Sequence, residues 1–243
     1  MKIVPLILLL AFATLHPFIR IGHRGAYDYE PENTLRSFEK AIELGVDMIE
    51  LDVYQCASHE LVVMHDDDVD RTTNGHGPVE AKTLAQLKLL DAGKGEKIPT
   101  LQEVFDLVNR KVKINIELKG PHTAQATADL IYLYVNSKGW RFDDFYVSSF
   151  DHQELMRFHA ACPQVKIGGL YESSRKPFAK KNYKSFYAIG VAKNSLTQKY
   201  IDRAHKKGLK IFAYTVNDAD EIKKMKAMGV DGIFSNYPDK FGA

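Results

Sequence analysis

The sequence contains few cysteines, no excess of either charge and no apolar run long enough to cross a membrane. Only two cysteines occur in 243 residues, which excludes a disulfide framework and a cysteine-based metal site. The 33 basic residues nearly balance the 31 acidic ones, so a nucleic-acid partner is not indicated. The apolar run at the N-terminus, residues 3–13, is shorter than the roughly 20 residues that span a bilayer.

The chain does contain enough apolar material for a full hydrophobic core. Hydrophobic residues make up 45% of the sequence and charged residues 26%, which are ordinary values for globular proteins. This composition excludes wholesale disorder. The length allows one large α/β domain or two smaller domains.

Residues 1–16 form an apolar segment that precedes the expected folded domain. Lys2 precedes the apolar run, and Ala11-Phe12-Ala13 has the small-x-small pattern of a signal-peptide cleavage site. Cleavage after residue 13 would be early for an export signal, and two cysteines are compatible with a reducing compartment. We therefore expect a cytoplasmic protein, with export or membrane association through residues 1–13 as the alternative.

Short β-rich runs alternate with segments of helical spacing along the rest of the chain. The predicted strands are 18–22, 48–54, 112–118, 145–149, 165–170, 186–191, 210–216 and 232–235. The predicted helices are 34–44, 100–108, 124–137, 152–160, 198–207 and 219–228. Asn33 is the expected cap of the first helix, and Thr100 with Glu103 forms a capping-box pattern.

Eight strands that alternate with helices predict a (β/α)₈ barrel, the TIM-barrel fold. A doubly wound open sheet is the competing architecture, but its Gly-x-Gly-x-x-Gly signature does not follow the first strand. The alternation breaks once, where 60–65 has the pattern of an extra strand and 66–99 forms a long polar insertion. An insertion of this length commonly has a function, such as covering a site. We expect a single barrel domain, 17–243, with this small insertion after the second strand.

Three acidic side chains fall near the carboxyl ends of predicted strands. Glu50 and Asp52 lie two residues apart on the second strand and so point to the same face. Glu117 lies near the end of the next barrel strand. Burying carboxylates inside a barrel is costly unless they are paired or bind a metal ion. Three oxygen ligands favour one hard divalent cation, Mg²⁺ or Ca²⁺, over zinc.

Two histidines end strands at the same rim of the barrel. His23 ends the first strand and His65 ends the extra strand. Imidazoles beside a metal-bound phosphate can act as base and acid near neutral pH. Arg24 offers a planar fork for phosphate oxygens and Lys119 a point charge. An ion pair of Arg24 with Glu50 or Glu117 is the structural alternative.

An ordered series of motifs resembles the glycerophosphodiester phosphodiesterase family. The motifs are His23-Arg24-Gly25, Pro31-Glu32-Asn33-Thr34, Glu50-x-Asp52, Val62-Val63-Met64-His65-Asp66 and Glu117-x-Lys119. The stretch from Arg71 to Gly77 is similar to that of the family's short bacterial members, and the resemblance extends from residue 19 to residue 239.

This resemblance implies a metal-dependent hydrolysis of glycerophosphodiesters to sn-glycerol 3-phosphate and an alcohol. Glu50, Asp52 and Glu117 match the family's metal ligands, and His23 and His65 match its acid–base pair. Arg24 and Lys119 match phosphate-contacting positions. The resemblance also implies that the neighbouring glycerol hydroxyl attacks phosphorus before water completes the reaction.

The sequence departs from the family pattern at two places. Ser58-His59-Glu60 replaces the usual Asp-Gly turn before the extra strand. Tyr214 stands where many relatives carry tryptophan; it retains an aromatic wall for the glycerol group and adds a hydroxyl. We expect the turn to change shape and the chemistry to be retained.

Three other functions compete with hydrolysis of soluble diesters. Cleavage of lysophospholipids would use the same site with a wider mouth, and an N-terminal segment seated on a membrane would favour it. A non-catalytic barrel that binds phosphorylated ligands would lack a catalytic histidine or carboxylate, and none is missing. A sugar-phosphate isomerase would need a glycine-rich phosphate cradle at the last two strands, where the sequence instead has Asn217 and Ser235-Asn236-Tyr237.

Overall fold

The computed structural model describes residues 18–174 and 184–242. The apolar N-terminal segment expected at residues 1–16 lies outside the described residues. Among the described residues, every helix is too short or too polar to span a membrane.

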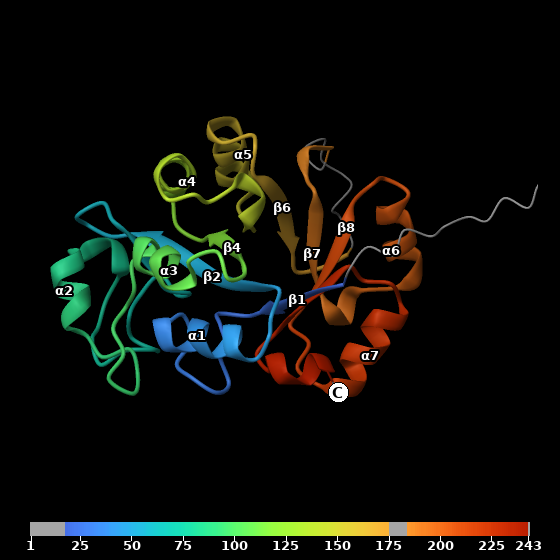
Figure 1. The fold of residues 1–243 in the computed structure, drawn as a ribbon, viewed down its shortest axis with the longest axis horizontal. Coiled ribbons are helices and arrows are strands. Elements are labelled where there is room, and N and C mark those ends of the chain that lie inside the picture. Colours follow the sequence, from blue (N-terminus) through green and yellow to red (C-terminus); the bar gives the residue numbers. More distant parts are fainter. Residues whose placement is uncertain (1–17, 175–183, 243) are drawn as a thin grey trace, which may run out of the picture.

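Eight parallel strands form a closed barrel (Figure 1). They are β1 (Ile19–Gly22), β2 (Met48–Gln55), β4 (Lys113–Leu118), β5 (Phe145–Ser149), β6 (Lys166–Tyr171), β7 (Ala188–Ala192), β8 (Lys210–Tyr214) and β9 (Gly232–Ser235). Strand β1 pairs with β9 on one side and with β2 on the other, which closes the sheet. The predicted barrel is confirmed, and the open doubly wound sheet is excluded.

Helices surround the barrel, as Figure 1 shows. They are α1 (Leu35–Glu43), α3 (Leu101–Val108), α4 (Thr123–Ser137), α5 (His152–Ala161), α6 (Gln198–His205) and α7 (Ala219–Ala227). Short 3₁₀ turns occur at η1 (Val79–Ala81), η2 (Phe142–Asp144), η4 (Lys193–Ser195) and η5 (Pro238–Gly242). The buried faces of the helices pack on the outward residues of the strands in one continuous apolar core.

One helix cap agrees with the cap predicted from the sequence, and another differs from it. The hydroxyl of Thr100 accepts from the backbone N–H of Glu103, and the Glu103 carboxylate accepts from the N–H of Thr100, as predicted. Asn33 was expected to cap α1, and this is wrong: Thr34 is the cap and accepts from the N–H of Ser37. Asn33 instead points its amide at Asp52.

The segment after the second strand has more structure than its polar sequence suggested. Strand β3 (Leu61–Val63) pairs antiparallel with the end of β2. The stretch 66–99 contains η1 and a short helix, α2 (Leu84–Leu89), which we did not predict. Its start is nevertheless encoded locally, because Thr83 and Gln86 form a capping box. A small apolar cluster that includes Val69 and Leu87 anchors this segment against β3.

The barrel interior has an apolar layer beneath a polar one. Ile21, Met48, Tyr146 and Phe212 fill the lower layer. Further along the strands the inward residues are acidic, and Asp52 lies directly opposite Glu117 in the β2–β4 register. The strands therefore deliver charged side chains to the end of the barrel where their carboxyl termini meet.

Candidate active site

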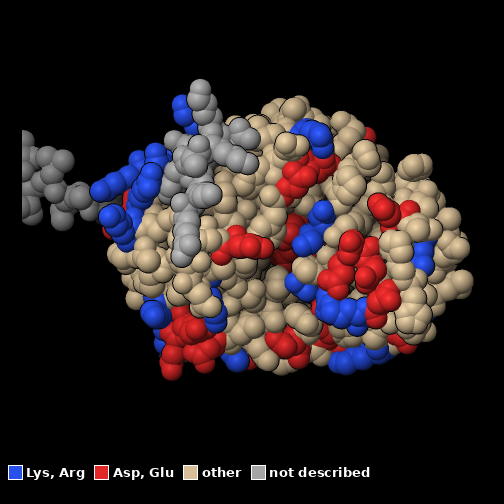
Figure 2. Space-filling view, turned by 180° about the vertical axis from the view of Figure 1, so that it is seen from behind, with Lys and Arg blue, Asp and Glu red and all other residues tan. Residues whose placement is uncertain are grey.

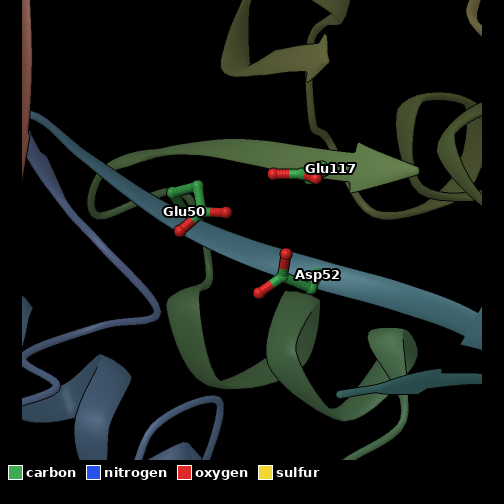
Figure 3. Close-up of side chains that lie close together, drawn as sticks. All are labelled: Glu50, Asp52 and Glu117. Carbon is green, nitrogen blue, oxygen red and sulfur yellow. The ribbon is translucent and has the colours of Figure 1, made fainter. Parts of the chain in front are cut away.

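Three carboxylates converge inside the top of the barrel. Glu50 and Asp52 extend from β2 and Glu117 from β4, and the three side chains point toward one another (Figure 3). One oxygen from each lies within 4.8 Å of the others. The three residues are only 2%, 1% and 8% exposed. The structure thus brings together the three acids that the sequence singled out.

The hydrogen bonds of these carboxylates leave oxygens free to bind a cation. Asn33 Nδ2 donates to Asp52 Oδ2 at 2.9 Å, and the backbone N–H of Arg24 donates to Glu50 Oε2 at 2.8 Å. Asp52 Oδ1 is buried and accepts no hydrogen bond, and Glu117 Oε1 lies 3.2 Å from Lys119 Nζ without a well-aligned one. Buried anionic oxygens without donors fit a hard divalent cation.

Burial and the charges of neighbouring carboxylates raise the pKa of two of these acids. Burial and then the charge of Asp52 raise the pKa of Glu117 to about 7, although Lys119 opposes the shift. The pKa of Glu50 is raised well above its usual value for the same two reasons, with Glu117 adding to the effect. At least one proton therefore stays on the metal-free cluster near neutral pH.

We expect the stability of the metal-free protein to fall as pH rises from 6.5 to 8. Glu117 titrates near 4.5 when unfolded and near 7 when folded, so its stabilising proton is lost as pH rises through 7. The pKa of His23 is lowered to about 4 from 6.5, which opposes the trend up to about pH 7.5, whereas the raised pKa of Glu50 adds to the fall. Thermal unfolding in EDTA measures the effect.

The matched variant for this prediction is Glu117→Gln. It should reduce the fall in melting temperature between pH 6.5 and 8, because the titrating carboxyl is gone. A melting temperature that rises over this range in the wild type, or an unchanged slope in the variant, would contradict the shifted pKa values.

His23 lies at the end of β1 beside the carboxylates. Its Nδ1 is 2.7 Å from Asn236 Oδ1, just after β9. Because an amide oxygen only accepts, Nδ1 carries the proton and Nε2 of the neutral ring keeps its lone pair. Burial, followed by the charge of Arg24, lowers the pKa of His23 to about 4. This imidazole is therefore neutral at pH 7.

His65, just after β3, has a charged partner instead. Its Nδ1 is 2.6 Å from Asp66 Oδ1, and its Nε2 is 3.3 Å from Lys119 Nζ. A carboxylate beside an imidazole stabilises the imidazolium form. Arg71 and then His65 hold the pKa of Asp66 near 2, so Asp66 is ionised at neutral pH.

Arg24 and Lys119 bring positive charge to this group from the ends of two different strands, β1 and β4. The Arg24 guanidinium donates to Glu32 Oε1 at 2.8 Å and lies 3.7 Å from Asp52. The expected alternative for its side chain, an ion pair with Glu50 or Glu117, is not formed; Glu50 takes the backbone N–H. Lys119 Nζ lies between His65 and Glu117. Both positively charged side chains can therefore contact an anion that binds next to the carboxylates.

A cavity of about 230 Å³ joins these residues. Its lining contains both histidines, Arg24, Lys119, Glu50 and Glu117, together with Phe150, Leu170, Tyr214, Thr215 and Phe234. The Tyr214 ring meets Phe150 and Phe234 edge to face. Its hydroxyl donates to the Tyr171 carbonyl at 2.8 Å, so the ring forms a wall and the hydroxyl is used within the protein.

Several residues of this site were missed from the sequence. Asn33 lies within a recognised motif, but its amide was assigned to a helix cap. Asn236 is 213 residues from His23 along the chain, and no local pattern connects them. Phe150 follows β5 and carries an exposed ring; its position directly after a strand was the only available signal.

Known proteins are similar to this chain in sequence. The model of the glycerophosphoryl diester phosphodiesterase family matches residues 23–240. A glycerophosphodiester phosphodiesterase of Caldanaerobacter subterraneus is 36% identical over 90% of this chain and 94% of its own length. One from Bacillus subtilis is 32% identical over 92% and 85%.

Solved structures give the same result. An Oleispira antarctica phosphodiesterase, solved in complex with the product sn-glycerol-3-phosphate, superposes with a TM-score of 0.84 at 28% identity, covering 92% of this chain and 95% of that one. A Thermotoga maritima glycerophosphodiester phosphodiesterase superposes with a TM-score of 0.75 at 30% identity, covering 93% and 98%. The chain belongs to the glycerophosphoryl diester phosphodiesterase family of enzymes.

Proposed function

We propose that this enzyme hydrolyses glycerophosphodiesters to sn-glycerol 3-phosphate and an alcohol by metal-assisted acid–base catalysis. The observation that carries the proposal is one cavity lined by two histidines, two positively charged side chains and two carboxylates, with the third carboxylate, Asp52, grouped with those two. The product complex of the Oleispira antarctica relative supports the same product for this chain.

Glu50, Asp52 and Glu117 are the residues that would hold one divalent cation, Mg²⁺ or Ca²⁺. Their donor set is all oxygen, and the buried Asp52 Oδ1 has no other partner. Such an ion would polarise the phosphoryl oxygens and lower the pKa of a nearby hydroxyl. Asn33 and the backbone of Arg24 orient two of the three carboxylates.

We assign His23 as the first base. Its ring is neutral, and the Asn236 carbonyl directs the proton to Nδ1, which leaves the Nε2 lone pair available. We assign His65 as the acid, because the Asp66 carboxylate pairs with its Nδ1 and can balance the charge of an imidazolium. The two histidines thus differ through their partners: one is an amide and the other a carboxylate.

The reaction then balances in two steps. In the first, the neighbouring glycerol hydroxyl gives its proton to His23 and attacks phosphorus, while the bond to the leaving alcohol breaks and His65 protonates that oxygen. In the second, water gives a proton to the now neutral His65 and attacks the cyclic phosphate. His23 returns its proton to the glycerol oxygen, which yields glycerol 3-phosphate and restores both rings.

Arg24 and Lys119 would bind the phosphoryl oxygens from two sides. Arg24 offers charge-assisted hydrogen bonds from a planar group, whereas Lys119 acts as a point charge. The Tyr214 ring, supported by Phe150 and Phe234, would cover the glycerol carbons. The 230 Å³ cavity suits a small soluble diester.

Release of glycerol 3-phosphate from glycerophosphocholine and glycerophosphoethanolamine tests this proposal. We expect product from at least one of them with Mg²⁺ or Ca²⁺ present and none in EDTA. Turnover of lysophospholipids but of neither soluble diester would show that the substrate is the lipid. No product from the soluble diesters or from lysophospholipids would favour a non-catalytic barrel that binds phosphorylated ligands.

We also propose a cytoplasmic location for the protein. Its support is that Cys56 and Cys162 are both buried free thiols, as is usual in a reducing compartment. Intact-mass measurement on protein from the native cells should find residues 1–13 retained; their removal would indicate export.

A further inference from the structure

Arg71 has no assigned role in the chemistry above, yet it makes four hydrogen bonds to two carboxylates beside the site. Its Nε and Nη2 donate to Asp66 Oδ2 and Oδ1 at 2.6 and 3.1 Å. Its Nη1 and Nη2 donate to Glu32 Oε2 and Oε1 at 2.7 and 2.8 Å. One guanidinium therefore bridges two acids from different parts of the chain.

Each of those acids holds a residue of the proposed mechanism. Asp66 Oδ1 also accepts from His65 Nδ1 at 2.6 Å, and Glu32 Oε1 also accepts from Arg24 Nη1 at 2.8 Å. A continuous chain of charge-assisted hydrogen bonds therefore runs from His65 through Arg71 to Arg24. On the face shown in Figure 2, acidic and basic side chains lie side by side around a hollow.

Residues 66–99 place Arg71 in this bridge. The Val69 carbonyl accepts from both the backbone N–H and the hydroxyl of Thr73, which closes a turn around Arg71. Val69 is fully buried in the small apolar cluster of this segment, and the Thr72 hydroxyl contacts Met64 Sδ in the same cluster. The turn is thus anchored on both sides of Arg71.

We propose that Arg71 is a positioning residue, through which the 66–99 segment orients the His65–Asp66 pair and the phosphate-binding Arg24. This inference rests on the proposed function, because the proposed function assigns His65 and Arg24 their roles. The geometry needs an arginine, since a lysine ammonium lacks the planar fork that can meet two carboxylates bidentately. Glu32 is the shared partner, and its 8% exposure shields the Glu32 end of the bridge from water.

The test is Arg71→Ala, with Arg20→Ala as the matched control. Arg20 also makes a bidentate pair, to Asp47, and its side chain is 43% exposed against 44% for Arg71. It lies at the opposite end of the barrel. We expect Arg71→Ala to lower kcat about 10- to 100-fold, the scale on which misplaced functional groups lose activity, with KM within about threefold.

Added guanidinium ion should restore several-fold activity to Arg71→Ala and none to Arg20→Ala. Unchanged kcat in Arg71→Ala would overturn the inference. So would a loss that guanidinium does not relieve, because damage to the fold alone would produce it.

A second readout separates this inference from the proposed function. In protein labelled at histidine nitrogens and free of substrate, Arg71→Ala should shift the ring signals of His65 and leave those of His23 in place. If the wild type released no product, the proposed function would fail, while the ring signals would still decide whether Arg71 positions His65. Unshifted His65 signals would overturn the inference.

Discussion

Replacing His23 and His65 by alanine should lower turnover of a natural glycerophosphodiester by about 10²- to 10⁴-fold each, the usual contribution of a general acid or base. The two variants should separate on a glycerophosphodiester whose leaving group is 4-nitrophenol. That alcohol departs without a proton, so His65→Ala should recover most of its loss in a single turnover. His23→Ala should not, because the attacking hydroxyl still needs a base.

The matched control is His205→Ala. His205 on α6 is also a partly exposed histidine paired with a carboxylate, since its Nε2 lies 2.9 Å from Asp231. It is remote from the cavity, and turnover should stay within about twofold of the wild type. Recovery by His23→Ala instead of His65→Ala would reverse the roles of base and acid. If each variant lost the same activity on both substrates, the assignment of His23 as base and His65 as acid would be wrong.

Asp52→Asn should lower turnover about a thousandfold, equivalent to roughly 4 kcal/mol of transition-state stabilisation. The substitution keeps the shape of the side chain and an oxygen that can accept from Asn33, but it removes one of the three charges that would hold the ion. It also relieves repulsion among buried carboxylates. We therefore expect the melting temperature in EDTA to be unchanged or higher, while the gain on adding Mg²⁺ or Ca²⁺ is lost.

Glu154→Gln is the matched control for this buried carboxylate. Glu154 is 2% exposed and accepts from the backbone of Ala124 and from Arg157, outside the site. Its replacement should lower the melting temperature and leave turnover unchanged, the opposite pattern to Asp52→Asn. A variant at Asp52 that unfolds at lower temperature in EDTA would mean that the carboxylate stabilises the fold directly.

The features predicted well from the sequence are those that local pattern and strand geometry control. Alternating strands and helices predicted the barrel, and two-residue spacing placed Glu50 and Asp52 on one face. Their positions at strand ends then indicated Glu117, His23 and His65. These predictions needed only the rule that parallel strands share an edge.

The features that were missed depend on contacts between distant segments. The amide that orients His23 comes from Asn236, at the far end of the chain. Asn33 carries a side chain typical of a helix cap, yet a positive φ of 58° at this residue and the buried Asp52 direct its amide into the site. The bridging role of Arg71 needs the folded positions of both Glu32 and Asp66, which neither spacing nor composition provides.

Calorimetric titration of Mg²⁺ and Ca²⁺ into metal-free wild type and Asp52→Asn tests the central claim, that Glu50, Asp52 and Glu117 hold the cation required for turnover. We predict one ion bound per wild-type chain, with the affinity reduced at least about a hundredfold in the variant, since one of three charged ligands is lost. Equal affinity in the two proteins, or an active wild type that binds neither ion, would contradict it.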